Sequence, residues 1–291
     1  MASRKGDSRT VREVFVYRPG AIGDTILTLP ALAALRRRFP TCRMTFAGNA
    51  AVLPLLPVDE RLSADDPRLL PLFEEPPRPW RQFDLQVVFA RQPALGDIQR
   101  DPIEAVSRAR HVADWLVEAI DPGFADRTPR LAFQSPLPAG PDQPRPFVIH
   151  PGAGGPLKCW PAANFARVVE QIGWPVAVIA GPADDSAVEA FASSCQVAFE
   201  LWKGLDLATL AAKLSRARGF LGNDSGISHL AAALGVPTAA VYLTTDPAVW
   251  GIRGRHVRRL PGNVTVGETV TSCQDLMLES AAQVLRSEQA V

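Results

Sequence analysis

The sequence predicts an α/β protein made of two doubly wound lobes that face a common cleft. Short apolar runs rich in β-branched residues alternate with helical stretches, which is typical of doubly wound parallel sheets. A strand followed by x-Pro-Gly-Ala-x-Gly occurs twice, at residues 16–23 and 148–155, so both halves of the chain start in the same way. With 291 residues, of which 47% are hydrophobic, the chain can bury a core in each lobe.

The first lobe is predicted to start with a strand, a glycine loop and a helix. Three strands are expected, over residues 14–17, 43–47 and 85–90. The helix from Asp24 to Phe39 ends before Pro40 and leads at once into the second strand, as in a right-handed parallel crossover. Residues 54–82, which are rich in proline, arginine and acidic residues, are predicted to form a loop with short helical pieces.

Predicted strands and helices alternate more regularly in the second lobe. Residues 134–146 contain five prolines and are expected to link two domains, residues 1–137 and 138–291. The last helix of the second domain is a candidate to pack back on the first lobe. The predicted strands cover 147–150, 176–180, 197–200, 218–221 and 237–243, and the predicted helices cover 161–172, 184–194, 207–216 and 226–234.

Composition excludes several classes of function. The 31 Lys and Arg residues are balanced by 30 Asp and Glu, and the net charge of +1 argues against a nucleic acid partner. The four cysteines form no C-x-x-C pair, so neither a zinc cluster nor a disulfide framework is predicted, and a reducing, cytoplasmic location is expected. No apolar run is convincing as a membrane span or a secretory signal.

The sharpest chemical motif follows the strand that ends at Leu221. Asp224, Ser225, Gly226 and His229 lie where the next helix begins, and the free amides of a helix N-terminus attract an anion such as a diphosphate. The simpler alternatives stay open here: Asp224 or Ser225 as a helix N-cap, and His229 as a buried structural residue.

A second motif follows the strand at 147–150. The small residues Ala153, Gly154 and Gly155 open the chain, and Lys158 is a candidate to place a positive charge on a phosphate. On its own, Lys158 is better explained as a surface lysine, and its pairing with the Asp224 loop is what favours the phosphate role.

The first glycine loop supplies a carboxylate. Asp24 follows Gly23 at the start of a helix, where it is either a capping residue or a general base at the cleft. Asp184 or Asp185, after the strand at 176–180, is placed where an acid can contact a ribose hydroxyl, but helix capping is the preferred explanation. No D-x-D, P-loop, H-E-x-x-H or G-x-S-x-G motif occurs, so no dedicated metal site is predicted.

Three segments together resemble glycosyltransferase family 9, which includes bacterial ADP-heptose:lipopolysaccharide heptosyltransferases. They are VFVYRPGAIGDTILTLPALAALRRRFP at 14–40, VIHPGAGGPLKCWPAANFARVV at 148–169, and residues 201–252 with LGNDSGISHLAAALG. The resemblance implies a GT-B fold, with an N-terminal acceptor-binding lobe and a C-terminal lobe that binds a nucleotide sugar. Residues 50–140 match poorly, and Ala153 to Gly155 replace the Ser or Thr found there in many members.

The resemblance also implies roles for individual residues. Asp24 is similar to the family's catalytic base, Lys158 to the lysine that binds the donor phosphate, and Asp224, Ser225, Gly226 and His229 to the loop that holds the diphosphate and the sugar. The donor-binding set predicted in full is Gly23, Ala153, Gly154, Gly155, Lys158, Asp184, Asp224, Ser225, Gly226 and His229.

The expected function is that of an inverting, metal-independent glycosyltransferase that needs no cofactor. It would transfer a sugar, with heptose from ADP-heptose as the first choice, to a lipopolysaccharide-type or other glycan or lipid-linked acceptor, in the cytoplasm or at the inner face of the membrane. Another nucleotide sugar and a catalytically silent nucleotide-sugar-binding protein are the alternatives. Arginines of the first lobe at 36–38, 78 and 81 are candidates for an anionic surface, or form an ordinary solvated face.

Overall fold

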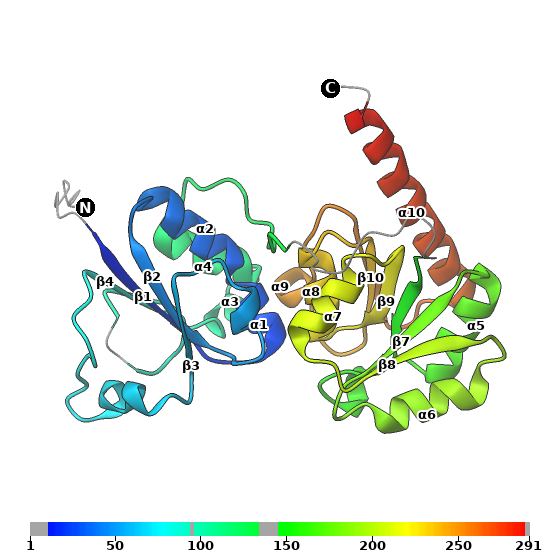
Figure 1. Ribbon diagram of the computed structural model, residues 1–291, viewed down its shortest axis with the longest axis horizontal. Coiled ribbons are helices and arrows are strands. Elements are labelled where there is room, and N and C mark those ends of the chain that lie inside the picture. Colours follow the sequence, from blue (N-terminus) through cyan, green and yellow to red (C-terminus); the bar gives the residue numbers. More distant parts are fainter. Residues whose placement is uncertain (1–10, 94–95, 134–144, 289–291) are drawn as a thin grey trace.

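The computed structural model describes residues 11–93, 96–133 and 145–288. Two lobes lie side by side, each with a parallel sheet flanked by helices (Figure 1). The strands are β1 (Glu13–Arg18), β2 (Arg43–Gly48), β3 (Glu60–Ser63), β4 (Leu85–Val88), β5 (Ile98–Gln99), β6 (Phe147–His150), β7 (Val176–Ala180), β8 (Phe199–Lys203), β9 (Gly219–Asn223), β10 (Thr238–Tyr242) and β11 (Val257–Pro261). This architecture confirms the predicted α/β fold with two doubly wound lobes.

Helices connect the strands. They are α1 (Ile22–Ile26), α2 (Leu29–Arg38), α3 (Glu104–Ser107), α4 (Val112–Ile120), α5 (Ala162–Ile172), α6 (Asp185–Ser194), α7 (Leu207–Leu214), α8 (Gly226–Ala233), α9 (Pro247–Trp250) and α10 (Val266–Glu288), with 3-10 turns at Leu53–Leu55, Pro67–Phe73 and Pro156–Lys158. No helix in the described part of the chain combines the length and the apolar character needed to cross a membrane.

The order of the strands places three loops at the positions where doubly wound sheets bind ligands. The first sheet has the order β3-β2-β1-β4-β5, and the second has the order β11-β10-β9-β6-β7-β8. The strand order reverses direction beside β1 in the first sheet and between β9 and β6 in the second. Ligands of open α/β sheets bind at such switch points, beyond the carboxyl ends of the strands. The loops after β1, β6 and β9 carry all three predicted motifs.

The first lobe differs from the prediction in a divided helix and in several elements that were not expected, namely β3, β5, α3 and α4. The helix expected from Asp24 to Phe39 is divided into α1 and α2, because Pro30 lies in the first turn of α2 and has no N–H to continue the hydrogen-bond ladder. The 54–82 segment contains β3, which pairs with β2 from Thr45↔Glu60 to Gly48↔Ser63. Its sequence, ERLS, lacks the apolar alternation that predicts a strand.

The second lobe follows the prediction closely, with strand β8 shifted to 199–203 and strand β11 missed. Helix α10 packs against α5, β9, β10 and β11, all of the second lobe, and its outer end projects from the molecule (Figure 1). The sequence had suggested that it packs back on the first lobe. Of the predicted linker 134–146, only residues 145 and 146 are described. The predicted domain boundary at residue 137 also lies outside the described residues.

The two lobes are tied together by direct contacts. Helices α1 and α8 pack on each other, and one hydrophobic cluster is continuous from Val14 and Leu32 in the first lobe to Phe220 and Leu230 in the second. Gly226 makes the approach possible, because a Cβ there would lie 2.7 Å from the Cβ of Ile22. The lobes therefore share part of their core.

Polar contacts join the lobes farther along the interface. Arg253 forms a bidentate ion pair with Asp114 at 2.7 Å for both contacts. His111 Nδ1 accepts from the amide of Ala113 at the start of α4, so its Nε2–H donates to the carbonyl of Gly251 at 2.8 Å. These bonds require a neutral imidazole. Burial, with the charge of Arg253, lowers the pKa of His111 to about 4.

Acid should therefore weaken the interface. An unfolded chain protonates His111 near its ordinary pKa of 6.5, whereas the folded protein resists until about pH 4. Below pH 6.5 the unfolded state binds more protons, so the free energy of unfolding falls, by about 3 kcal/mol from this group by pH 4. His111→Asn keeps an N-cap but removes the titration. The free energy of unfolding, measured by chemical denaturation at several pH values between 7 and 4, should fall less with pH in this variant than in the parent protein. An equal fall in both proteins would contradict the lowered pKa of His111.

Candidate functional site between the lobes

The predicted motifs meet at one cleft where α1 approaches α8. The cleft has a volume of about 400 Å³. The predicted residues that line it are Gly23, Asp24, Gly154, Lys158, Asp224, Ser225, Gly226 and His229, and they are joined by Ala21, Leu27, Ile103, Thr245 and Trp250. Residues from two lobes, separated by up to 229 positions in the chain, thus surround one space.

Asp24 is held in a fixed orientation on the first lobe. It is the third residue of α1, and its Oδ2 accepts from the amide of Ala21 at 2.9 Å, which is a capping interaction. Its Oδ1 accepts from Arg18 at 2.6 Å, and the Asp24 side chain keeps 27% exposure toward the cleft. The capping interpretation and the cleft position are therefore both correct.

Arg18 is a site residue that the motifs did not reveal. Its side chain is only 8% exposed, and it also donates to the carbonyls of Pro19 and Phe89. Burial lowers the pKa of Arg18, and the charge of Asp24 opposes this effect. The only sequence signal is an arginine at the end of an apolar strand, six residues before Asp24.

Lys158 and Asp224 form an ion pair across the second lobe. Lys158 Nζ lies 2.7 Å from Asp224 Oδ2, and the two side chains are 38% and 8% exposed. An ammonium group that is partly open to solvent beside a helix N-terminus suits a phosphate. The pair also fixes Asp224, whose carboxylate faces the same space.

Asn223 holds the glycine loop in place and was also missed. Its Nδ2 donates to the carbonyls of Pro151 and Gly152 at 2.8 and 3.1 Å, and its Oδ1 accepts from the amide of Trp160 at 2.8 Å. Three of the bonds that a buried amide side chain can make are thus satisfied. Asn223 connects the loop after β6 to the loop after β9.

His229 is buried and neutral. Burial is the main reason that its pKa is lowered to about 4, and the charges of Asp224 and Asp24 act in the opposite direction. A Cβ on Gly23 would lie 3.0 Å from its Cδ2 atom, so the ring packs directly against the first lobe. At neutral pH His229 therefore offers a dipole and a surface to a ligand rather than a positive charge.

A neighbouring hollow of about 510 Å³ shares Gly154 with the cleft. Ala153, Gly155 and Asp184 line this hollow and not the cleft itself. Its remaining walls are mostly apolar, with Trp160 and the first turns of α6 among them. Asp184 occupies the N-cap position of α6 without a side-chain capping bond, and its Oδ2 lies 3.0 Å from His150 Nε2. Its contact with a ribose stays a prediction.

The arginines at 36, 37, 78 and 81 each pair with an acidic residue of the first lobe, and Arg38 donates to the carbonyl of Ile120, which fits an ordinary solvated face. Within the described residues, no group of three or more His, Cys, Asp or Glu side chains is arranged to hold a metal ion.

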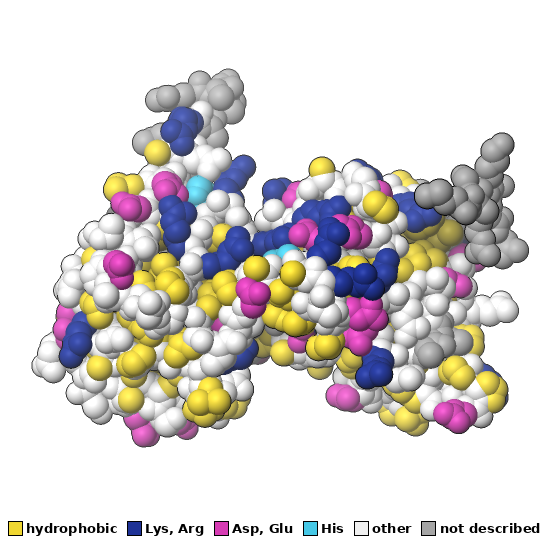
Figure 2. Space-filling view, turned by 180° about the vertical axis from the view of Figure 1, so that it is seen from behind, with side chains coloured by type: hydrophobic (Ala, Val, Ile, Leu, Met, Phe, Trp, Pro, Cys, Tyr) yellow, Lys and Arg dark blue, Asp and Glu magenta, His cyan; other side chains and the backbone are white. Residues whose placement is uncertain are grey.

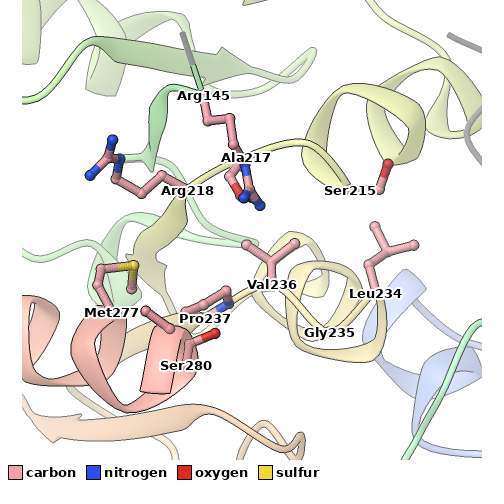
Figure 3. Close-up of a pocket in the computed structure, with 11 residues that line it drawn as sticks. Arg145, Ser215, Ala217, Arg218, Leu234, Gly235, Val236, Pro237, Met277 and Ser280 are labelled. Atoms are coloured by element: carbon pink, nitrogen blue, oxygen red, sulfur yellow. Dashed lines mark hydrogen bonds between the residues drawn. The ribbon is translucent and has the colours of Figure 1, made fainter. Parts of the chain in front are cut away.

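A separate hollow lies at the amino-terminal ends of strands β9 and β10, away from the carboxyl ends that face the cleft (Figure 3). Arg145, Arg218, Val236, Pro237 and Met277 are among its lining residues. None of the predicted site residues lines it, so the cleft between the lobes remains the candidate site.

The chain is similar in sequence to lipopolysaccharide heptosyltransferases. A lipopolysaccharide heptosyltransferase 1 of Pseudomonas aeruginosa is 28% identical over 301 aligned positions, which cover 83% of this chain and 81% of that protein. A lipopolysaccharide heptosyltransferase 3 of Escherichia coli is 32% identical over 110 positions, 35% of this chain. This second alignment spans only 32% of the length of that relative.

Solved structures share the fold. An E. coli heptosyltransferase, WaaC with ADP, superimposes with a TM-score of 0.71 at 18% identity, covering 91% of this chain and 99% of that one. At this identity the likeness establishes the two-lobed GT-B fold alone. The sequence profile of glycosyltransferase family 9 (heptosyltransferase) matches residues 104–271, from the end of the first lobe through the whole donor motif. This match covers more than half of the residues, and the chain therefore belongs to glycosyltransferase family 9.

Proposed function

We propose that the protein is an inverting, metal-independent glycosyltransferase that transfers heptose from ADP-heptose to a lipopolysaccharide-type or other glycan acceptor. One observation carries the proposal: Asp24 enters the cleft from the first lobe, and Lys158 with the N-terminus of α8 enters it from the second. A base and a leaving-group site on opposite sides of one space suit an in-line displacement.

In the proposed reaction, an acceptor hydroxyl donates its proton to the Asp24 carboxylate while its oxygen attacks the anomeric carbon. The bond from that carbon to the diphosphate oxygen breaks, and the nucleoside diphosphate leaves with the electron pair. Arg18 holds the carboxylate in a fixed orientation, so the base is correctly placed. The proton moves as the attacking oxygen bonds to carbon and its acidity rises.

The second lobe stabilises the charge that develops on the leaving group. The Lys158 ammonium and the free amides at the start of α8 provide this stabilisation without a metal ion. Asp224 then suits a sugar hydroxyl, because a carboxylate that faced the diphosphate would repel it. The hollow that adjoins Gly154 has the apolar walls that suit a nucleoside.

The choice of ADP and heptose comes from the relatives named above. The arginine and lysine side chains that gather where the lobes meet, on the face in Figure 2, suit an anionic acceptor such as a phosphorylated glycan or a lipid-linked sugar.

A panel of nucleotides tests the proposal. ADP at 100 times its dissociation constant should raise the free energy of unfolding by about 2.7 kcal/mol, and UDP and GDP at the same concentration should raise it less. Incubation with ADP-heptose and a heptose-deficient lipopolysaccharide should add one heptose by mass spectrometry. Stabilisation by UDP or GDP instead of ADP would show that the donor carries that nucleotide and would contradict ADP-heptose as the donor. Donor binding with neither transfer nor donor hydrolysis would favour a silent binding protein.

A further inference from the structure

One aromatic residue, Trp250, lines the cleft from the short helix α9. Figure 1 shows α9 at the junction of the two lobes, and Trp250 shares the cleft with Asp24 of the first lobe. The residue is half-buried, because it packs in part against the hydrophobic cluster that the lobes share. Trp250 therefore belongs to the core and to the wall of the cleft at the same time.

The backbone around Trp250 is held from several sides. Its amide donates within α9 at 3.0 Å, and its carbonyl faces the buried ring of His229. The carbonyl of the next residue, Gly251, accepts from His111 of the first lobe at 2.8 Å, and the amide after that donates to the Tyr242 hydroxyl at 2.8 Å. Because the backbone is engaged with the protein, the indole is the group that Trp250 can offer to a ligand, and it is offered from a fixed frame.

The first lobe contributes an exposed aliphatic side chain to the same cleft. Ile103 directly precedes α3 and is 66% exposed. His111, eight residues later, makes the bond to Gly251, so the segments that carry Ile103 and Trp250 are fastened to each other across the lobes. An apolar side chain left in water gains free energy when a ligand covers it.

The cleft thus combines charged groups with a small apolar surface. Its charges come from Asp24, Lys158 and Asp224, and its apolar surface includes Ile103 and Trp250. A sugar ring has the same division, since hydroxyl groups line its edge and C–H groups cover its faces. Aromatic and aliphatic side chains can pack on such a face while polar side chains bond the hydroxyls. An acyl chain has no polar edge and would leave the three charged side chains without partners.

We propose that Trp250 and Ile103 form an apolar subsite that packs on the C–H face of a sugar ring of the acceptor. The proposed donor contacts, Lys158 and Asp224, belong to the loops after β6 and β9. Ile103 instead comes from the lobe that carries Asp24, the proposed base for the acceptor hydroxyl. This inference rests on the proposed function and adds how the acceptor is held.

Contact with the indole can be measured without turnover. The chain has six tryptophans, and Trp250→Phe identifies the indole N–H signal of Trp250 in a nitrogen-15 NMR spectrum of the full chain. We expect deacylated, heptose-deficient lipopolysaccharide, added in the presence of ADP, to shift this signal. The signal of Trp174, which is also half-buried but lies outside the cleft, should stay in place. An unmoved Trp250 signal at the highest soluble concentration of this glycan would overturn the inference.

Kinetics separate the aromatic face from mere apolar bulk. Trp250→Leu keeps an apolar side chain against the core but has no flat ring, so the KM for the deacylated glycan should rise about 10-fold. The KM for ADP-heptose should stay within about twofold of the parent value. Trp250→Phe should restore most of the lost affinity for the glycan. Trp174→Leu, the matched control, should change neither KM.

Ile103 allows a second test, because a side chain this exposed contributes little to folding. Ile103→Ala should raise the KM for the deacylated glycan about 3- to 10-fold. Leu70 is equally exposed, at 66%, but lies on the 3-10 turn Pro67–Phe73 outside the cleft. Leu70→Ala should leave this KM unchanged, and equal effects of the two substitutions would remove Ile103 from the subsite.

The outcomes distinguish this inference from the proposed function. A rise in the KM for ADP-heptose alone in Trp250→Leu would place the ring on the donor sugar and overturn the inference. A loss of affinity for intact but not for deacylated lipopolysaccharide would assign the surface to acyl chains and overturn it as well. If the parent protein transfers no heptose, the proposed function fails, while the NMR signal of Trp250 still decides whether the indole meets a glycan.

Discussion

Replacing Asp24 with asparagine should lower the rate of sugar transfer by about 100- to 10,000-fold, the usual contribution of a general base. The amide keeps the shape of the side chain, and its single oxygen can still accept from either Arg18 or the amide of Ala21, but it cannot take a proton. The affinity for ADP should stay unchanged, because the protein groups proposed to bind the diphosphate lie on the second lobe. Initial rates with ADP-heptose and binding of ADP by calorimetry measure the two effects.

Asp59→Asn is the matched control. Asp59 also accepts from one arginine, Arg36, and from one backbone amide, that of Met44, both at 2.8 Å, but it lies outside the cleft. Any loss of stability that comes from weakening such a pair should appear in both variants, and the loss of transfer should appear only at Asp24. Normal transfer by Asp24→Asn would remove this residue from the mechanism.

Replacing Lys158 with methionine should weaken binding of ADP by about 10- to 100-fold, because a charge-assisted hydrogen bond to phosphate is lost. The transfer rate at saturating donor should fall further, since the charge on the departing diphosphate is greater in the transition state than in the bound substrate. Calorimetry with ADP gives the first effect, and saturating kinetics with ADP-heptose give the second.

Lys213→Met provides the comparison for Lys158. Lys213 also pairs with a carboxylate, that of Glu200 at 3.1 Å, and its side chain is similarly exposed, at 30% against 38%. Its loss should leave both measurements unchanged. If Lys158→Met binds ADP as tightly as the parent protein, the ion pair with Asp224 is structural, and the phosphate site must be sought elsewhere.

The donor half of the site was predictable because its chemistry is local in the chain. Gly154 and Lys158 follow one strand, and Asp224 to His229 follow another, so these residues can be recognised in the sequence directly after each strand. Parallel strands bring such loops to the same edge of a sheet. The order of strands and helices in the second lobe was predictable for the same reason.

The supporting residues could not be found in this way, because their partners are distant in the sequence. His150 is 34 residues from Asp184 and 75 from Ser225, and the bonds of Asn223 reach across 63 to 72 residues. Arg18 looks like the last residue of an ordinary strand until the fold buries it beside Asp24. Strand β3 was missed because its side chains are mostly polar, although its backbone completes the edge of the sheet.

The contact between α1 and α8 has a consequence for attempts to change what this enzyme makes. The proposed general base is carried by one of these helices and the proposed leaving-group amides by the other, and the glycine at 226 sets their separation. A side chain introduced there would move the whole reaction geometry at once, whatever substrate was intended. Redesign of acceptor choice has more freedom at the outer rim, where Ile103 lines the cleft and is 66% exposed.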